Sequence, residues 1–181
     1  MKNKYAVLVV DMLNDFVTGA LKCDRGLAIV PKTKELLEGA REKGVPVIFC
    51  NDAHLKDIDH ELKLWGNHAI IGTKGAEVIP ELGLCEKDYV VPKRRYSGFF
   101  QTDLKLLLDE LGVDTVIMTG LHTHMCVRHT SADAYQYGYS VLVAKDATDS
   151  FTEEDYNYGI KYLKDTYGAE ISDVDSILKK I

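Results

Sequence analysis

The sequence is poor in cysteine and contains no C-x-x-C pair. That absence excludes the usual spacing of zinc knuckles and of thioredoxin-like dithiols. The 181 residues include four cysteines, Cys23, Cys50, Cys85 and Cys126. We interpret Cys50 and Cys85 as small buried hydrophobes, and Cys23 lies in a polar stretch that predicts no particular role. Cys126 remains as the cysteine that needs a chemical explanation.

Long apolar runs are also absent. The first run, YAVLVV, covers residues 5–10 and is ended by Asp11. A signal-peptide core needs about 7–15 apolar residues, and a membrane-spanning helix needs about 20. We therefore expect a cytoplasmic protein with no membrane partner, and in a reducing cytosol we expect no disulfides.

An excess of positive charge is missing as well, because the formal net charge is -6 at pH 7. Since lysine and arginine are spread along the chain, no nucleic-acid partner is expected. The sequence has no G-x-G-x-x-G after a strand, no Walker lysine loop and no G-x-S-x-G motif. These absences argue against dinucleotide binding, P-loop chemistry and a serine nucleophile of the α/β-hydrolase type.

Alternating strands and helices are what the sequence does contain. Continuous apolar runs predict strands at 5–10, 45–50, 89–92, 113–120 and 139–144. Helical spacing and caps predict helices at 28–44, 102–112, 125–137 and 152–168, and a short last helix from Ser172 or Asp173. This alternation predicts an α/β fold, a three-layer sandwich whose mostly parallel, doubly wound sheet carries helices on both faces. We expect residues 1–181 to form one domain.

Polar residues follow four of these strands at the point where each strand ends. Asp11 follows the first strand, and Asn51-Asp52-Ala53-His54 follows the second. Lys93 follows the third, and the stretch that contains Cys126 follows the fourth. Ligands of open α/β sheets bind beyond the carboxyl ends of the strands. The sequence therefore predicts a functional site at this edge of the sheet.

Asp11, Lys93 and Cys126 form a chemically coherent set, although each alone is also compatible with a structural role. A thiol is a poor nucleophile until it loses its proton. Cys126 is expected in the first turn of a helix, where the helix dipole favours a thiolate, and Lys93 would lower the thiol pKa further. Asp11 could take the thiol proton and later pass it to a leaving amine. The set predicts an activated cysteine nucleophile.

A second set lies in the long irregular stretch 51–75. Its pattern, D-x-H-x5-H-E-x6-H, supplies Asp52, His54, His60, Glu61 and His68. Imidazole and carboxylate groups together suit Zn, Mn or Fe(II). Asp52 and His54 can point to the same side, because positions i and i+2 of an extended chain share a face. The alternative is a polar loop that contains histidines by chance.

Five motifs, in this order, resemble the cysteine hydrolases of the isochorismatase-like superfamily, particularly the amidases related to nicotinamidase and pyrazinamidase. The motifs span nearly the whole chain: VVDMLNDF (9–16), NDAH (51–54), WGNHAIIGTKGAEVIPEL (65–82), KRRYSGFFQTDL (93–104) and TGLHTHMCVRHTSADAYQYGY (119–139). The resemblance implies the Rossmann-like isochorismatase-like hydrolase fold. It also implies an amidohydrolase that cleaves the C–N bond of a small amide through a thioester, with nicotinamide as the leading candidate.

The resemblance implies a role for each residue of the first set. Asp11 corresponds to the family's proton-shuttling aspartate, Lys93 to its lysine and Cys126 to its nucleophile. A non-proline cis peptide bond is expected between Leu121 and His122. The backbone N–H groups of His122 and Cys126 would then form an oxyanion hole.

The same resemblance implies a divalent metal ion, most readily zinc, with manganese or iron as alternatives. Asp52, His54 and His68 match the metal ligands of nicotinamidases. The fourth ligand is Glu61 or, in the arrangement of other relatives, His60. The ungapped spacing from 61 to 68 favours Glu61.

The substrate is less well defined than the family. Phe16 and Trp65 match positions where relatives place aromatic walls against a planar substrate. An N-carbamoyl or ureido compound is the alternative, and a carboxylate on it could be bound by Arg94, Arg95 or Arg128. A non-catalytic thiol protein, for redox sensing or binding, is the alternative from another class. We also expect a homo-oligomer, from the resemblance and from the tyrosine-rich segment 156–167.

Overall fold

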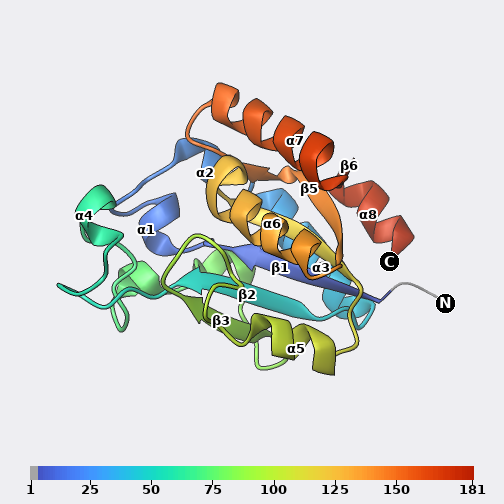
Figure 1. The fold of residues 1–181 in the computed structure, drawn as a ribbon, viewed down its shortest axis with the longest axis horizontal. Helices are drawn as coiled ribbons and strands as arrows, with labels where there is room; N and C mark the ends of the chain where they lie inside the picture. Colours follow the sequence, from blue (N-terminus) through green and yellow to red (C-terminus); the bar gives the residue numbers. More distant parts are fainter. Residues whose placement is uncertain (1–3) are drawn as a thin grey trace.

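In the computed structural model, which describes residues 4–181, six parallel strands form one sheet in the order β3-β2-β1-β4-β5-β6. Figure 1 shows this sheet at the centre of the molecule, with helices around it. The expected α/β class with a parallel, doubly wound sheet is confirmed. The strands are β1 (Tyr5–Val10), β2 (Val47–Asp52), β3 (Tyr89–Lys93), β4 (Thr115–Leu121), β5 (Ser140–Asp149) and β6 (Glu170–Ser172).

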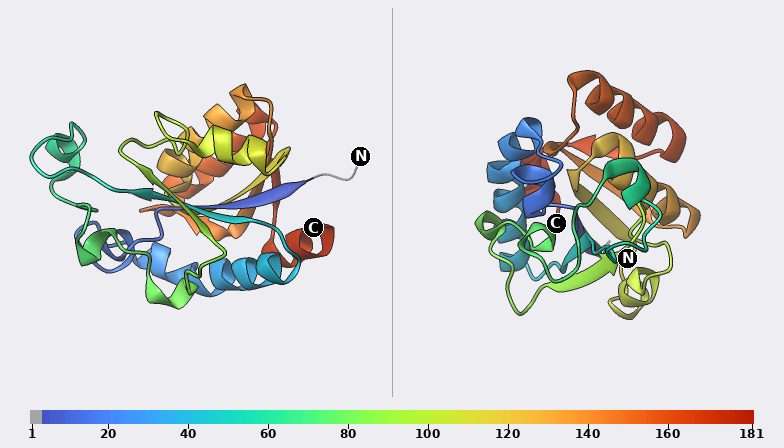
Figure 2. Two further views of the ribbon diagram at one scale, coloured as in Figure 1. Left: turned by 90° about the horizontal axis from the view of Figure 1, so that it is seen from below. Right: turned by 90° about the vertical axis from the view of Figure 1, so that its left-hand side faces the viewer.

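Both faces of the sheet are covered, which explains why its central strands are continuously apolar. Successive side chains of β1 point to opposite faces, so Val7 and Val9 join one core while Ala6 and Leu8 join the other. Figure 2 shows the two helical layers on either side of the sheet. The first core is covered by α1 (Asn14–Val17), α2 (Asp24–Ala28), α3 (Val30–Glu42) and α8 (Val174–Lys180), the second by α5 (Leu104–Glu110), α6 (Arg128–Gln136) and α7 (Glu153–Tyr167).

Some elements differ from the sequence prediction. β5 extends to Asp149 rather than residue 144, and β6 was not predicted because its three residues, EIS, carry no apolar run. The long connection after β2 contains α4 (Leu62–Trp65) and two short 3-10 turns, η1 (Lys74–Ala76) and η2 (Pro80–Leu82). Cys85 lies in this connection and is exposed, so its interpretation as a buried hydrophobe was wrong.

The strand order reverses direction between β1 and β4, and this switch point is where doubly wound sheets bind their ligands. Val10 of β1 pairs with Gly120 of β4. Gly120 has a φ of +99°, and a Cβ there would lie 2.1 Å from the carbonyl oxygen of Val10. Only glycine therefore allows the two strands to end side by side. Among the described residues, no helix is both long and apolar enough to cross a membrane.

Candidate active site

The ends of β1, β2 and β3 bring two carboxylates and a lysine into one buried cluster. Lys93 Nζ lies 2.7 Å from Asp11 Oδ2 and 2.6 Å from Asp52 Oδ1. A carboxylate oxygen of Asp11, one of Asp52 and the sulfur of Cys126 all lie within 4.8 Å of one another. The structure thus brings Asp11, Lys93 and Cys126 together, although they are far apart in the sequence.

Asp11 is held at the turn after β1 with a φ of +53°, in the left-handed region. Its Oδ1 accepts a hydrogen bond of 2.7 Å from the backbone N–H of Asp52. Burial and the charge of Asp52 raise the pKa of Asp11 to about 7, although Lys93 acts to lower it. A carboxyl group with such a pKa can both accept and return a proton near neutral pH.

The thiol of Cys126 behaves differently from the sequence prediction. Burial raises the pKa of Cys126 above its ordinary value, and the positive charge of Lys93 offsets only part of this effect. The expectation that the helix start and Lys93 would give a lowered thiol pKa was therefore wrong, because it left out burial. A thiol whose pKa is raised needs a base to remove its proton before it can act as a nucleophile.

Cys126 lies in a π-helical turn, η3 (Thr123–Val127), that joins β4 to α6. The peptide bond between Leu121 and His122 is cis, as the resemblance predicted. The carbonyl oxygen of His122 accepts hydrogen bonds from the backbone N–H groups of Met125 and Val127. Such π-helical turns are frequent at functional sites.

Four buried residues of the long connection and of β2 form a second cluster next to the first. One ligand atom from each of Asp52, His54, Glu61 and His68 lies within 4.8 Å of the others. His60, the alternative fourth residue, is exposed and does not belong to this cluster. The loop geometry therefore agrees with Glu61.

The two histidines of this cluster are oriented like metal ligands. His54 Nδ1 lies 3.0 Å from Asp59 Oδ2, and His68 Nδ1 lies 2.9 Å from the carbonyl oxygen of Gly66. Because Nδ1 of each ring contacts these partners, Nε2 is the nitrogen that faces the carboxylates of the cluster. Asp59 was missed in the sequence, where nothing but its place five residues after His54 could have indicated it.

The donor atoms fit a divalent metal ion. His54 Nε2 and Glu61 Oε2 are buried 3.3 Å apart, and neither makes a hydrogen bond of good geometry within the described chain. Burial acts to lower the pKa of His54, but hydrogen bonds and charges of the surrounding carboxylates raise it to about 10. The cluster thus favours positive charge, and its nitrogen and oxygen donors match those of zinc, manganese and iron sites.

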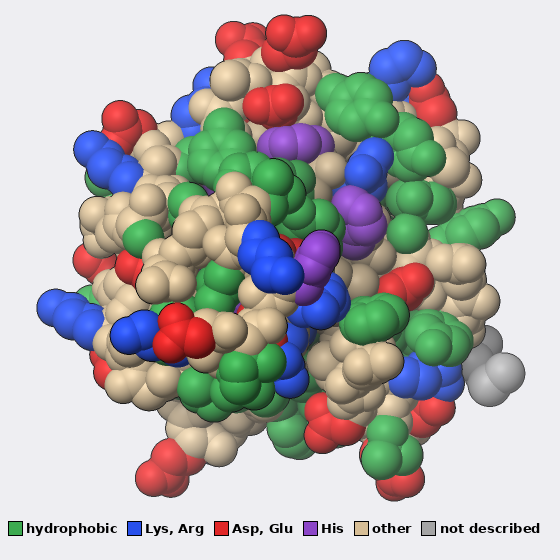
Figure 3. All heavy atoms as spheres, turned by 60° about the vertical axis from the view of Figure 1, so that its left-hand side comes forward, with side chains coloured by type: hydrophobic (Ala, Val, Ile, Leu, Met, Phe, Trp, Pro, Cys, Tyr) green, Lys and Arg blue, Asp and Glu red, His purple; other side chains and the backbone are tan. Residues whose placement is uncertain are grey.

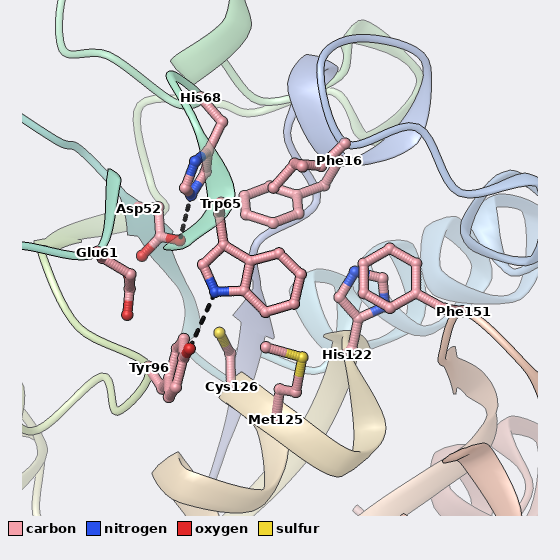
Figure 4. A pocket seen from close by; sticks show the side chains of 11 residues that line it. Phe16, Asp52, Glu61, Trp65, His68, Tyr96, His122, Met125, Cys126 and Phe151 are labelled. Carbon is pink, nitrogen blue, oxygen red and sulfur yellow. Dashed lines mark hydrogen bonds and ion pairs between the residues drawn. The ribbon is translucent and has the colours of Figure 1, made fainter. Parts of the chain in front are cut away.

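A narrow aromatic pocket leads to Cys126. Figure 4 shows Phe16, Trp65 and Phe151 around it, with Glu61 at one side. Trp65 Nε1 donates a hydrogen bond of 3.0 Å to Tyr96 Oη, which holds the indole ring over the pocket. The lining side chains leave only about 10 Å³ between them, room for about one water molecule. Phe16 and Trp65 were expected here, whereas Leu21, Tyr96, Met125 and Phe151 were not.

The three arginines that could have bound a substrate carboxylate do not line this pocket. Arg94 pairs with Asp59, and Arg95 donates a hydrogen bond to the carbonyl oxygen of Arg94. Arg128 lies over the ring of Tyr162, 5.0 Å from its centroid. Among the described residues that line the pocket, none is lysine or arginine. The described pocket residues therefore include no lysine or arginine that could pair with a substrate carboxylate.

The surface around the pocket mixes apolar, cationic and histidine side chains, as Figure 3 shows for the face at the carboxyl ends of the strands. Two apolar residues of the long connection, Ile58 and Leu64, are exposed. Neither takes part in the core.

Comparisons with known proteins agree with the site. The family model described as isochorismatase domain matches residues 5–176. Nicotinamidase 3 of Arabidopsis thaliana is 33% identical, over 88% of this chain and 84% of its own.

Three solved structures are closely similar. An isochorismatase-like hydrolase from Alkaliphilus metalliredigens has a TM-score of 0.92 and 40% identity, over 97% of this chain and 98% of its own. N-carbamoylsarcosine amidase from Thermoplasma acidophilum has a TM-score of 0.89 and 38% identity, over 95% of this chain and 97% of its own. A pyrazinamidase of Pyrococcus horikoshii in complex with zinc has a TM-score of 0.87 and 32% identity, over 94% of this chain and 99% of its own.

Proposed function

Because the chain belongs to the isochorismatase domain family, we propose that it is a cysteine amidohydrolase that cleaves the C–N bond of a small, uncharged amide. The observation that carries this proposal is the buried contact of Asp11 with Lys93, within reach of the Cys126 sulfur and beside an aromatic pocket. The relatives that act on nicotinamide, pyrazinamide or N-carbamoylsarcosine support the reaction class.

The reaction begins with transfer of the Cys126 thiol proton to Asp11, whose pKa of about 7 suits this step. The thiolate sulfur attacks the amide carbonyl carbon, and the backbone N–H groups of His122 and Cys126 stabilise the oxyanion. When the C–N bond breaks, Asp11 returns the proton to the leaving nitrogen and ammonia departs. Lys93 keeps its charge throughout, because the two carboxylates raise its pKa against the opposing effect of burial.

Hydrolysis of the thioester completes the cycle. Asp11 takes a proton from a water molecule, whose oxygen attacks the thioester carbonyl. The C–S bond breaks, and the returning proton restores the thiol of Cys126. The products are a carboxylic acid and ammonia, and the narrow pocket keeps other water away from the thioester.

Asp52, His54, Glu61 and His68 would hold a divalent metal ion, with zinc as the leading candidate. Such an ion supplies Lewis acidity and a binding point for a polar group of the substrate. Asp52 links the two clusters, because its other oxygen accepts a hydrogen bond from Lys93.

Nicotinamide is the leading substrate candidate, since a planar aromatic amide matches a pocket lined by Phe16, Trp65 and Phe151. An N-carbamoyl compound is the second candidate, favoured by the similarity to N-carbamoylsarcosine amidase. The lack of lysine or arginine among the described pocket residues argues against a substrate that carries a carboxylate there.

Ammonia release separates these candidates and tests the mechanism. We expect wild-type protein to release ammonia from nicotinamide faster than from N-carbamoylsarcosine, and Cys126→Ala to abolish both activities. Cys85→Ala is the matched control, because Cys85 is exposed and does not line the pocket. Ammonia release that persists in Cys126→Ala would exclude the thioester route. A wild-type protein without activity on either amide would favour the non-catalytic thiol protein.

We also propose that the protein forms a homo-oligomer. The proposal is supported by tyrosines of α6 and α7 that lie outside the core, since Tyr135 is 52% exposed and Tyr158 is 51% exposed. The guanidinium group of Arg128 lies over the rings of Tyr158 and Tyr162. If a second subunit covered this surface, the cation would keep these aromatic contacts after losing its water. Light scattering coupled to size-exclusion chromatography should give a multiple of 20.3 kDa, and a monomer would contradict the proposal.

A further inference from the structure

Buried threonine hydroxyl groups surround the end of β4, just before the turn that carries Cys126. The side chains are those of Thr119, Thr123 and Thr148, and each residue is at most 1% exposed. A hydroxyl group that loses its water on burial needs a partner within the protein. Here the partners are backbone carbonyl groups and a second threonine, so the hydroxyl groups fix the backbone around them.

Thr148 of β5 holds the backbone on both sides of His122. Its hydroxyl group donates a hydrogen bond of 2.8 Å to the carbonyl oxygen of Gly120, and its oxygen lies 2.8 Å from that of Thr123. Thr148 has a single hydroxyl hydrogen, which it donates to Gly120, so Thr123 is the donor in the second contact. The hydrogen bonds therefore run from Thr123 through Thr148 to Gly120, and His122 lies between the two ends in the sequence.

An irregularity in β5 brings Thr148 to this place. Met118 of β4 pairs with Val143, whereas Gly120 pairs with Thr148. Between these pairs β4 advances by two residues and β5 by five, so β5 bulges out of the regular ladder. Bulges next to active sites commonly serve to redirect a side chain. Here the bulge places the Thr148 hydroxyl group against the last turn of backbone before His122.

We propose that Thr148 is a positioning residue that fixes the backbone N–H of His122 as a donor of the oxyanion hole. This inference rests on the proposed amidase function and concerns its transition state. Thr148 is not among the described residues that line the pocket, so it acts through the backbone of Gly120 and through Thr123. An oxyanion-hole donor is effective only when its position is set before charge develops on the substrate oxygen.

Steady-state kinetics of Thr148→Val test the proposal, because valine keeps the branched shape and removes the hydroxyl group. The substrate is nicotinamide or N-carbamoylsarcosine, whichever the wild-type protein hydrolyses. We expect kcat to fall about 10- to 100-fold, since a displaced donor stabilises the oxyanion less well. KM should change less than about twofold, because the lost alignment acts in the transition state. Thr148→Ser keeps both hydrogen bonds and should recover most of the lost kcat.

Nicotinaldehyde, the aldehyde analogue of nicotinamide, gives a second measurement. The Cys126 sulfur adds to its carbonyl carbon, the π electrons of the C=O bond move to oxygen, and the thiol proton passes to Asp11. The adduct thus carries an oxyanion, and its Kd from calorimetry should rise in Thr148→Val by about the factor by which kcat falls. Alkylation of Cys126 by iodoacetamide forms no oxyanion, so its rate should stay the same.

Thr115→Val is the matched control. Thr115 is a buried threonine at the start of β4, and its hydroxyl group donates a hydrogen bond to Asp114 Oδ1. Its loss should leave kcat unchanged, because this end of the strand is remote from the turn. If Thr148→Val does not fold, Thr123→Val breaks the same hydrogen bonds at their other end and should show the same pattern.

Three results would overturn the proposal: a wild-type kcat in Thr148→Val, a loss of kcat that iodoacetamide alkylation shares in proportion, or no recovery in Thr148→Ser. The second result would mean that the substitution disturbs the thiol rather than the oxyanion hole. Failure of the proposed hydrolysis is seen separately, as absence of ammonia release from either amide by the wild-type protein.

Discussion

At the scale of single residues, the site combines an acid and a thiol whose pKa values have both been moved by burial. Burial raises the pKa of Asp11 to about 7 and also raises the pKa of Cys126 above its ordinary value. The thiol therefore needs a base to become a nucleophile, and Asp11 is the group near the sulfur that can accept a proton near neutral pH.

The first prediction concerns Asp11→Asn. Asparagine has nearly the same shape but cannot accept the thiol proton, so kcat should fall about 10²- to 10⁴-fold. Steady-state ammonia release checks the rate, and alkylation of Cys126 should slow in parallel. Asp24→Asn is the control, since the Asp24 side chain is 82% exposed. An Asp11→Asn protein with wild-type kcat would rule out Asp11 as the proton acceptor.

The second prediction concerns Asp59, which orients His54 and pairs with Arg94. Asp59→Asn should lower metal affinity about 10- to 100-fold, because loss of such a partner frees the ligand ring and lowers its basicity. Competition with a chromophoric chelator measures the affinity. Asp57→Asn, an exposed change in the same loop, should have no effect. Equal affinities in all three proteins would contradict this role for Asp59.

Residues that directly follow a predicted strand could be identified from the sequence. Residues whose role depends on contacts with distant parts of the chain could not. Asp11, Lys93 and Cys126 each follow a strand, so topology alone predicts their meeting. Asp59 and Phe151 do not follow a predicted strand. A single acidic or aromatic residue in a loop can have many different roles, so the sequence does not indicate these two. The direction of the Cys126 pKa shift was missed for a related reason: the degree of burial depends on how Phe16, Trp65 and Tyr96 close the pocket.

At the scale of elements, apolar continuity predicted the central strands, and capping predicted the late helices. Thr152 accepts a hydrogen bond from the backbone N–H of Asp155, and Asp173 accepts one from Ser176, as expected for N-caps. The helix predicted at 102–112 is shorter in the structure, where α5 covers Leu104–Glu110. The π-helical turn at Cys126 could not be predicted from its own residues, and in the structure it packs closely against α7, which lies further along the chain.

That packing gives the third prediction, for Gly159 of α7. A Cβ at this position would lie 2.8 Å from the backbone nitrogen of His124 and 2.9 Å from the carbonyl carbon of Thr123. Gly159→Ala should therefore push the π-helical turn aside and lower kcat, even though alanine favours an isolated helix by about 1 kcal/mol. In Gly39→Ala, the control, the new methyl group meets only the flexible side chain of Leu178. Ammonia-release kinetics should separate the two variants, and equal kcat values would contradict the prediction.

At the scale of the whole molecule, an ion pair ties the long connection to the first helical layer. Arg41 of α3 lies 2.7 Å from Asp88 Oδ2 and also donates hydrogen bonds to the carbonyl oxygen of Leu82. Burial acts to raise the pKa of Asp88, but the hydrogen bonds from Arg41 and Cys85 lower it below its ordinary value. The pair thus holds the last part of the connection, just before β3.

The fourth prediction follows from the sign of this shift. A carboxyl group whose pKa is lowered by folding stabilises the protein above its unfolded pKa, about 3.9, and loses that contribution as the pH falls through the folded value. Asp88→Asn should lower the free energy of unfolding by about 1–3 kcal/mol at pH 7. Denaturant titrations should show the difference from wild type shrinking below about pH 4. A difference that is constant with pH would exclude the ion pair as its cause.

The close approach of Val10 and Gly120 has a consequence for how activity is acquired. The base stands at the end of β1 and the thiol beyond the end of β4, and the two ends become neighbours only when strands separated by most of the chain have paired. Contacts between distant segments form late, because the intervening chain must first lose its freedom. After dilution from denaturant, recovery of amide hydrolysis should therefore report that the complete sheet has formed. Recovery of the helical circular dichroism signal alone should not report this.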